Sequence, residues 1–162
     1  MPGVTVYFTH EYKVAGYKRQ KFAKLVRSIC ARFGLENVTV DIAIVDNGII
    51  RKLNGRFLNR KTTTDCLSFD LSQPDKDNRL FELVVNGERA KEEAARRGHP
   101  ARDELALYIT HGLLHLLGFN DQRPAQAKKM HALEDEILMQ HGFVPAFNRK
   151  TKIVHNSRRR KC

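Results

Sequence analysis

The chain has 162 residues, 41% of them hydrophobic, a length and composition that fit one globular domain and exclude a disordered or fibrous chain. Its net charge of +11 favours a polyanionic partner, nucleic acid above all. No run of about 18 apolar residues is present and Met1 to Thr9 does not read as a secretory signal, so neither a membrane span nor export is expected.

Hydrophobic periodicity and turn residues predict four strands and five helices. In chain order these are a strand at Val4 to Phe8, a helix at Tyr17 to Phe33, a strand at Val38 to Val45, a helix from about Gly48 to Phe57, strands at Cys66 to Leu71 and Leu80 to Val85, a helix at Gly87 to Arg97, a helix opened by Pro100 and ended by Gly118, and a last helix from about Ala125 to His141. The order lacks regular βαβ alternation. We therefore predict an α+β fold in which a small mixed four-stranded sheet packs against about five helices.

The helix opened by Pro100 is apolar on nearly every side, so it should be the buried central helix. No internal repeat or linker divides the chain. We expect a single domain over residues 1–149 and a basic, disordered tail over residues 150–162.

Basic residues gather in two places that suit the backbone of RNA. The polar face of the predicted helix at Tyr17 to Phe33 carries Lys18, Arg19, Lys21, Lys24, Arg27 and Arg32. The tail carries Lys150, Lys152, Arg158, Arg159, Arg160 and Lys161. Solvated surface charge is the simpler interpretation of both. The aromatic residues are scattered, so base-specific stacking is not indicated.

The three cysteines, Cys30, Cys66 and Cys162, lie far apart in the sequence and are odd in number. This spacing argues against a disulfide framework and against a cysteine metal site. Two buried thiols and one tail thiol in a reducing cytoplasm are expected.

Two histidines four residues apart, His111 and His115, lie on the most apolar helix, where both imidazoles would share one face. Gly118 follows and lets the chain turn back, so that Asp121 can complete a set of three ligands. Three protein ligands and an open position are typical of a catalytic metal site, with zinc the first candidate. Two core histidines with satisfied hydrogen bonds are the alternative, and the spacing alone leaves both open.

A peptidase is disfavoured because zinc peptidases of this spacing carry glutamate, their general base, directly after the first histidine. Here that residue is Gly112.

The segment HGLLHLLGFND, from His111 to Asp121, resembles the signature HGxLHLxGYDH of the bacterial YbeY family of rRNA maturation endoribonucleases. A second block resembles the family's LNxxYR and PTDVLSF motifs. It runs from Leu53 to Leu58 and, after a short basic loop, from Thr64 to Phe69. The resemblance covers the chain up to about Gly142 and leaves the basic tail outside.

This resemblance implies a metal-dependent endoribonuclease specific for single-stranded RNA, acting in 16S rRNA 3′-end maturation and ribosome quality control. It implies 16S rRNA and the small ribosomal subunit as partners, with no membrane and no DNA specificity. It also implies one Zn²⁺ per chain, with Mn²⁺ or Ni²⁺ as alternatives, held by His111, His115 and Asp121.

The sequence departs from the family pattern near the expected site. Asp121 replaces the third histidine, Leu58 replaces an arginine, Thr63 replaces a proline, and Phe81-Glu82 replaces Gly-Asp. The charge of Asp121 predicts weaker acidification of metal-bound water or a preference for harder ions such as manganese. Arg56 and Arg60 flank Leu58 and are candidate phosphate contacts, although solvated surface charge is an equal interpretation.

Two other functions stay open at this stage. The chain could be a family member that binds RNA or ribosomes with weakened or lost catalysis, which the replacements at Leu58 and Asp121 favour. It could also be a metal-dependent hydrolase of another substrate, such as a small phosphoester or a peptide.

Overall fold

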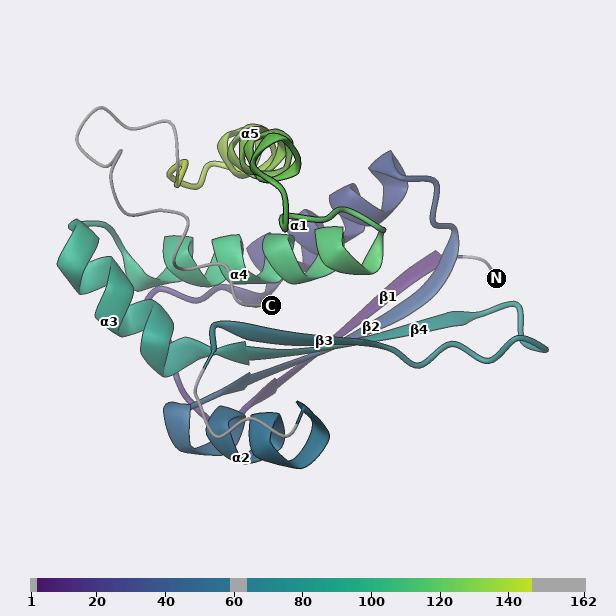
Figure 1. The fold of residues 1–162 in the computed structure, drawn as a ribbon, viewed down its shortest axis with the longest axis horizontal. Helices are drawn as coiled ribbons and strands as arrows, with labels where there is room; N and C mark the ends of the chain where they lie inside the picture. Colours follow the sequence, from purple (N-terminus) through teal and green to yellow (C-terminus); the bar gives the residue numbers. More distant parts are fainter. Residues whose placement is uncertain (1–2, 59–63, 147–162) are drawn as a thin grey trace.

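The structure is a computed structural model that describes residues 3–58 and 64–146 (Figure 1). Its elements are β1 (Gly3–His10), α1 (Arg19–Arg32), β2 (Asn37–Val45), α2 (Asn47–Leu58), β3 (Cys66–Asp70), β4 (Arg79–Asn86), α3 (Gly87–Arg97), α4 (Ala101–Leu116) and α5 (Pro124–Gln140). All nine elements predicted from the sequence are present. The tail at 150–162 lies outside the described residues.

The four strands form one mixed sheet in the order β1-β2-β4-β3. β1, β2 and β4 are parallel, and β3 runs antiparallel to β4 at the edge of the sheet. The predicted α+β class is confirmed, although β1, α1 and β2 form one parallel βαβ unit. β1 extends beyond the predicted strand because it pairs with β2 from Gly3 to His10, and this pairing outweighs the polar character of its last two residues.

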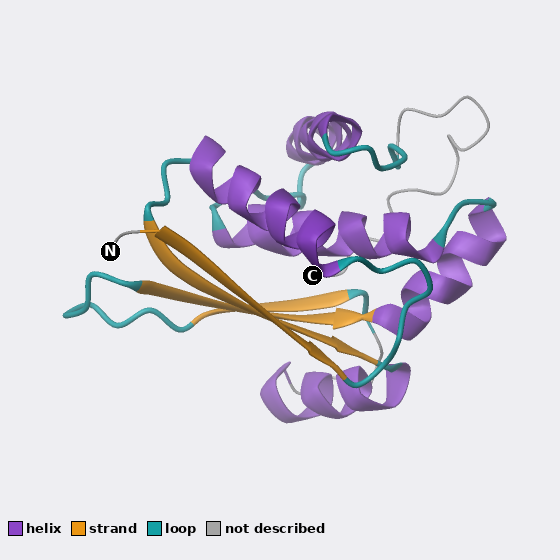
Figure 2. Ribbon diagram, turned by 180° about the vertical axis from the view of Figure 1, so that it is seen from behind, coloured by secondary structure: helices purple, strands orange, loops and turns teal. Residues whose placement is uncertain are grey.

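The helices cover the sheet in layers. α1 and α4 pack on one face and α5 lies outside them, whereas α2 packs on the opposite face (Figures 1 and 2). α4 lies over β3 and β4, and α1 lies over β1. The main core fills the space between the sheet, α1, α4 and α5, and a smaller one, built on Val45, Ile50, Leu67 and Val84, lies under α2.

α4 is the buried central helix that the sequence predicts. Its side chains from Asp103 to Leu114 are all buried. The acidic residues of its first turn have local partners: the Glu104 carboxylate lies 2.8 Å from Nε2 of His99, and the Asp103 carboxylate accepts a hydrogen bond of 2.7 Å from the Val144 amide. The start of α4 is thereby tied to the segments before it and after α5.

Two arginines of α1 cover the free edge of β1. Arg19 donates a hydrogen bond to the Val6 carbonyl at 3.5 Å, and Arg27 donates one to the Val4 carbonyl at 3.3 Å. An uncovered edge strand would present unpaired backbone groups to other chains. These two basic side chains therefore have a structural role besides their charge.

Cys30 and Cys66 are buried thiols that form no disulfide with each other, as expected, and burial raises the pKa of the Cys30 thiol to about 11. Within the residues that the structure describes, no helix has the length and apolar character needed to cross a bilayer.

Candidate metal centre

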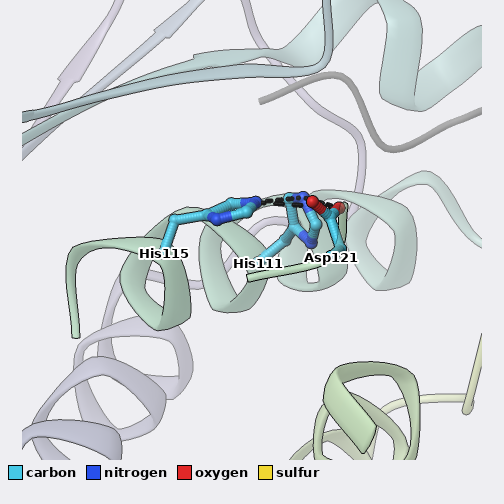
Figure 3. A group of neighbouring side chains, drawn as sticks. All are labelled: His111, His115 and Asp121. Carbon is cyan, nitrogen blue, oxygen red and sulfur yellow. Dashed lines mark hydrogen bonds and ion pairs between the residues drawn. The ribbon is translucent and has the colours of Figure 1, made fainter. Parts of the chain in front are cut away.

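α4 and the turn after it bring His111, His115 and Asp121 together (Figure 3). The histidines lie near the end of α4, and Gly118, with φ of +99°, reverses the chain just beyond it. A left-handed residue of this kind suits glycine because it has no Cβ. The reversal returns Asp121 to the two imidazoles, so the three residues that the sequence predicts as ligands share one site.

The ligand atoms form a compact triangle. The Nε2 atoms of the two histidines are 3.1 Å apart. Oδ2 of Asp121 lies 3.7 Å from Nε2 of His111 and 3.8 Å from Nε2 of His115. A triangle with these sides has a circumscribed radius of about 2.1 Å, which matches a zinc–nitrogen bond of about 2.0–2.1 Å. The spacing of the three atoms therefore suits a small divalent ion.

Both imidazoles are oriented through their other ring nitrogen. Nδ1 of His111 lies 2.6 Å from the Glu134 carboxylate, and Nδ1 of His115 lies 3.1 Å from the Phe119 carbonyl. A carbonyl only accepts hydrogen bonds, so Nδ1 of His115 carries the proton, and Nδ1 of His111 carries it as well when Glu134 is ionised. Both Nε2 lone pairs then face the triangle, which is the tautomer that a metal requires.

Three acceptor atoms facing one another repel unless a cation lies among them. Oδ2 of Asp121 is buried and has no hydrogen-bond partner among the described residues. The side chain of His111 is fully buried, whereas that of Asp121 is 12% exposed and that of His115 is 18% exposed. The donor set thus fits a divalent ion that is held deep on one side and reached by solvent on the other.

Gly112 follows the first histidine and faces the sheet. A Cβ at this position would lie 2.7 Å from Sγ of Cys66 and 2.9 Å from Cδ2 of Leu83. A glutamate in the place of the peptidase base would therefore clash with β3 and β4. This contact gives a packing reason for the glycine and agrees with the argument against a peptidase.

The candidate phosphate contacts lie on or beyond α2. Arg56 is exposed in the last turn of α2, and α2 covers the face of the sheet opposite to α4 (Figure 1). Its guanidinium carbon lies 5.7 Å from the centre of the Phe57 ring. Arg60 and Thr63 lie outside the described residues, in the segment that joins α2 to β3.

Phe81-Glu82, the replacement for the family's Gly-Asp, lies on β4. Phe81 is fully buried in the main core, and Glu82 is directed to the face of the sheet that α2 partly covers. His131 of α5 and His141, which follows α5, are partly exposed and do not belong to the group of candidate metal ligands.

Glu134, which contacts His111, is a site-supporting residue that the sequence analysis missed. Glu134 could have been noticed as a carboxylate on the apolar face of a predicted helix, four residues after Met130 and three before Ile137.

Comparison with known proteins agrees with this architecture. The family model described as "Endoribonuclease YbeY" matches residues 7–142. The Endoribonuclease YbeY of Myxococcus xanthus is 36% identical over 140 residues, which cover 82% of this chain and 48% of that protein. The Endoribonuclease YbeY of an Anaeromyxobacter species is 31% identical over 144 residues, which cover 88% of this chain and 75% of that protein.

The matched part of the chain thus spans about half the length of the Myxococcus relative. The solution structure of TM1509 from Thermotoga maritima has the same fold, with a TM-score of 0.56 and 22% identity, and the match covers 85% of this chain and 90% of that one. The family match extends over both motif blocks, over α4 and over the turn after it, and so includes all three candidate ligands. The chain therefore belongs to the YbeY family of endoribonucleases.

Proposed function

We propose that this chain is a metal-dependent endoribonuclease that cleaves single-stranded RNA, with Zn²⁺ held by His111, His115 and Asp121. The observation that carries the proposal is the triangle of three acceptor atoms, which all lie within 4.8 Å of one another. It occurs inside the segment that matches a family named for endoribonuclease activity. The proposed substrate is 16S rRNA near its 3′ end, in the context of ribosome maturation and quality control.

The side chains of the site have distinct proposed roles. His111 is fixed at the buried corner, and His115 and Asp121 form the solvent-facing edge where a phosphate would approach. A divalent ion, when bound, would supply a Lewis acid beside the scissile phosphate. Asp121 would also lower the net positive charge of the site, because it brings a full negative charge where histidine brings none. Mn²⁺ and Ni²⁺ are alternative ions.

Arginine would neutralise the charge that develops on the phosphate. We propose Arg60 and Arg56 as the candidates for this role, of which Arg60 lies outside the residues that the structure describes. Arg56 would have to reach around the β3 edge of the sheet from the opposite face.

RNA backbone would also be held away from the metal ligands. Within α1, Arg19 and Arg27 contact β1, and Arg32 pairs with Glu136. Lys24 of α1 and Lys18, the residue just before it, are the exposed lysines of this surface. We assign the basic residues of 150–162 the same role. A cytoplasmic location is proposed because the buried cysteines Cys30 and Cys66 are thiols rather than halves of a disulfide.

A second candidate is a member of the family that binds RNA but cleaves it weakly or not at all. Asp121 in place of histidine favours it, because a carboxylate ligand makes a bound ion a weaker acid. Leu58 in place of arginine favours it as well.

A cleavage assay on matched single-stranded and duplex RNA tests the proposal. The wild-type chain should cut only the single strand, and His115→Ala should remove both bound metal and cleavage. Cleavage that survives His115→Ala would contradict the metal mechanism. A wild-type chain that binds RNA without cutting it, and that gains cleavage through Asp121→His, would establish the second candidate instead.

A further inference from the structure

We infer that Glu134 is a positioning residue that fixes the orientation and tautomer of His111 and thereby sets the metal affinity of the centre. The inference deepens the proposed function and rests on the proposed metal site. Glu134 does not reach the triangle of ligand atoms itself. It would act through the imidazole of His111, from a helix that contributes no ligand to that triangle.

The contact between the two side chains is short and fully enclosed. Oε2 of Glu134 lies 2.6 Å from Nδ1 of His111, and both side chains have no exposed surface. The neighbours of Glu134 on the buried face of α5 include Met130, Ile137 and Leu138. Burial of a carboxylate in such surroundings costs free energy unless the group is hydrogen-bonded. The hydrogen bond to His111 offsets this cost.

The carboxylate determines which nitrogen of His111 carries the proton. Because an ionised carboxylate only accepts hydrogen bonds, Nδ1 must donate, and the Nε2 lone pair is directed to the triangle. A charge-assisted hydrogen bond of this kind also raises the basicity of the opposite nitrogen, which strengthens a metal ligand.

The two histidines are supported unequally. Nδ1 of His115 lies 3.1 Å from the Phe119 carbonyl, and this side chain is partly exposed. Nδ1 of His111 lies 2.6 Å from a carboxyl oxygen of Glu134, and this side chain is fully buried. We therefore assign His111 as the rigid anchor of the site. The contact also joins α5 to α4 directly behind the ligands, so α5 becomes part of the metal centre.

Asp135 provides a matched control. It is the next residue of α5 and is also a buried acid, and its carboxylate accepts a hydrogen bond of 2.7 Å from the Ala146 amide. Asp135→Asn therefore replaces a buried carboxyl group in the same helix turn while the contact between Glu134 and His111 stays intact.

The test compares Glu134→Gln, Glu134→Ala and Asp135→Asn in the full chain, with Zn²⁺ affinity measured by competition with a chromophoric chelator. Removal of a hydrogen-bond partner behind a metal ligand typically weakens binding by about 10- to 100-fold. We expect Glu134→Ala to lie in that range, Glu134→Gln to lose less, and Asp135→Asn to match the wild type. Wild-type affinity in both folded Glu134 variants, or an equal loss in Asp135→Asn, would overturn the inference.

A second readout does not need the metal. Nitrogen-15 NMR of the imidazoles in metal-free protein, above the ordinary histidine pKa, reports which nitrogen carries the proton. His111 should carry it on Nδ1 in the wild type and in Asp135→Asn, and should become a mixture of tautomers in Glu134→Ala. An unchanged His111 tautomer in Glu134→Ala would contradict the positioning role. A wild-type chain with the Nδ1–H tautomer but no Zn²⁺ affinity would instead overturn the proposed metal site.

Discussion

Gly112 of α4 and Cys66 of β3 lie in such close contact that a Cβ on the glycine would come within 2.7 Å of the cysteine sulfur. Each residue belongs to one of the two segments that carry the family resemblance. The contact seats α4 on the antiparallel edge of the sheet at the level of the metal ligands. The distance between β3 and the candidate metal centre therefore depends on the absence of a side chain at Gly112.

Gly112→Ala should destabilise the protein, although alanine favours helices by about 1 kcal/mol over glycine. Overpacking of a core typically costs about 1–3 kcal/mol, so a net loss of up to about 2 kcal/mol in the free energy of unfolding is expected. Urea denaturation measures it. Gly48→Ala is the matched control in α2, where the nearest atom to an added Cβ is Oδ1 of Asp46 at 3.4 Å. Equal stability changes in the two variants would contradict the close-contact account.

Much of the fold could be predicted because the spacing of apolar residues along each helix and strand depends on local structure. The helical spacing of apolar residues in α1 and their alternation in β2 each reflect one buried face. The apolar residues all around α4 reflect burial on every side. The exact start of α1 could not be predicted from the sequence. The expected helix began at Tyr17, but Gly16 adopts φ of +80° and Lys18 remains extended, so the helix starts at Arg19.

The ligand set was also predictable, because it lies within eleven consecutive residues of sequence. The residue that supports the ligands could not be predicted, since Glu134 contacts His111 across 23 residues of sequence. A contact of this kind depends on how α5 packs against α4, which no periodicity specifies. The placement of Arg56 shows the same limit, because sequence proximity to the motif did not indicate the face of the sheet on which α2 lies.

Removal of the Asp121 carboxylate should weaken the site more than a change of its chemistry does. Asp121→Ala deletes one corner of the triangle. Loss of a hydrogen-bond partner behind a metal ligand typically weakens binding by about 10- to 100-fold, so loss of the ligand itself should weaken Zn²⁺ binding by at least as much. Asp121→His should keep the ion, and chelator competition measures both variants. Gln122→Ala, an exposed neighbour, serves as the control. Full affinity in Asp121→Ala would show that this carboxylate is no ligand.

His141 should make stability depend on pH. Burial, with a smaller contribution from Lys24, lowers the pKa of His141 below its ordinary value of 6.5. The folded chain thus resists protonation, and stability should fall as pH drops through 6.5 and level off below the folded pKa. Urea denaturation from pH 8 to pH 5 should show a smaller loss in His141→Asn. Lys24→Gln should raise the pKa of His141 in an NMR titration, and a fall would contradict this assignment.

Neutralising exposed lysines of α1 should reduce the salt dependence of RNA binding. Each phosphate contact to a single strand contributes about 0.7 to the slope of log K against log salt. We expect Lys18→Gln combined with Lys24→Gln to flatten the slope by about 1.4, and deletion of residues 150–162 to flatten it as well. Lys52→Gln combined with Lys91→Gln, a pair of exposed lysines on α2 and α3, controls for net charge. Equal slopes in the two double variants would assign no specific role to α1.

The metal content of the chain, measured by elemental analysis of protein purified without an affinity tag, tests the central claim most directly. His115→Ala, which removes one corner of the triangle, is analysed beside the wild type. Three converging acceptors predict about one zinc or manganese ion per wild-type chain and none in the variant. Wild-type protein without metal, or equal metal in both proteins, would contradict the assignment of His111, His115 and Asp121 as a metal centre.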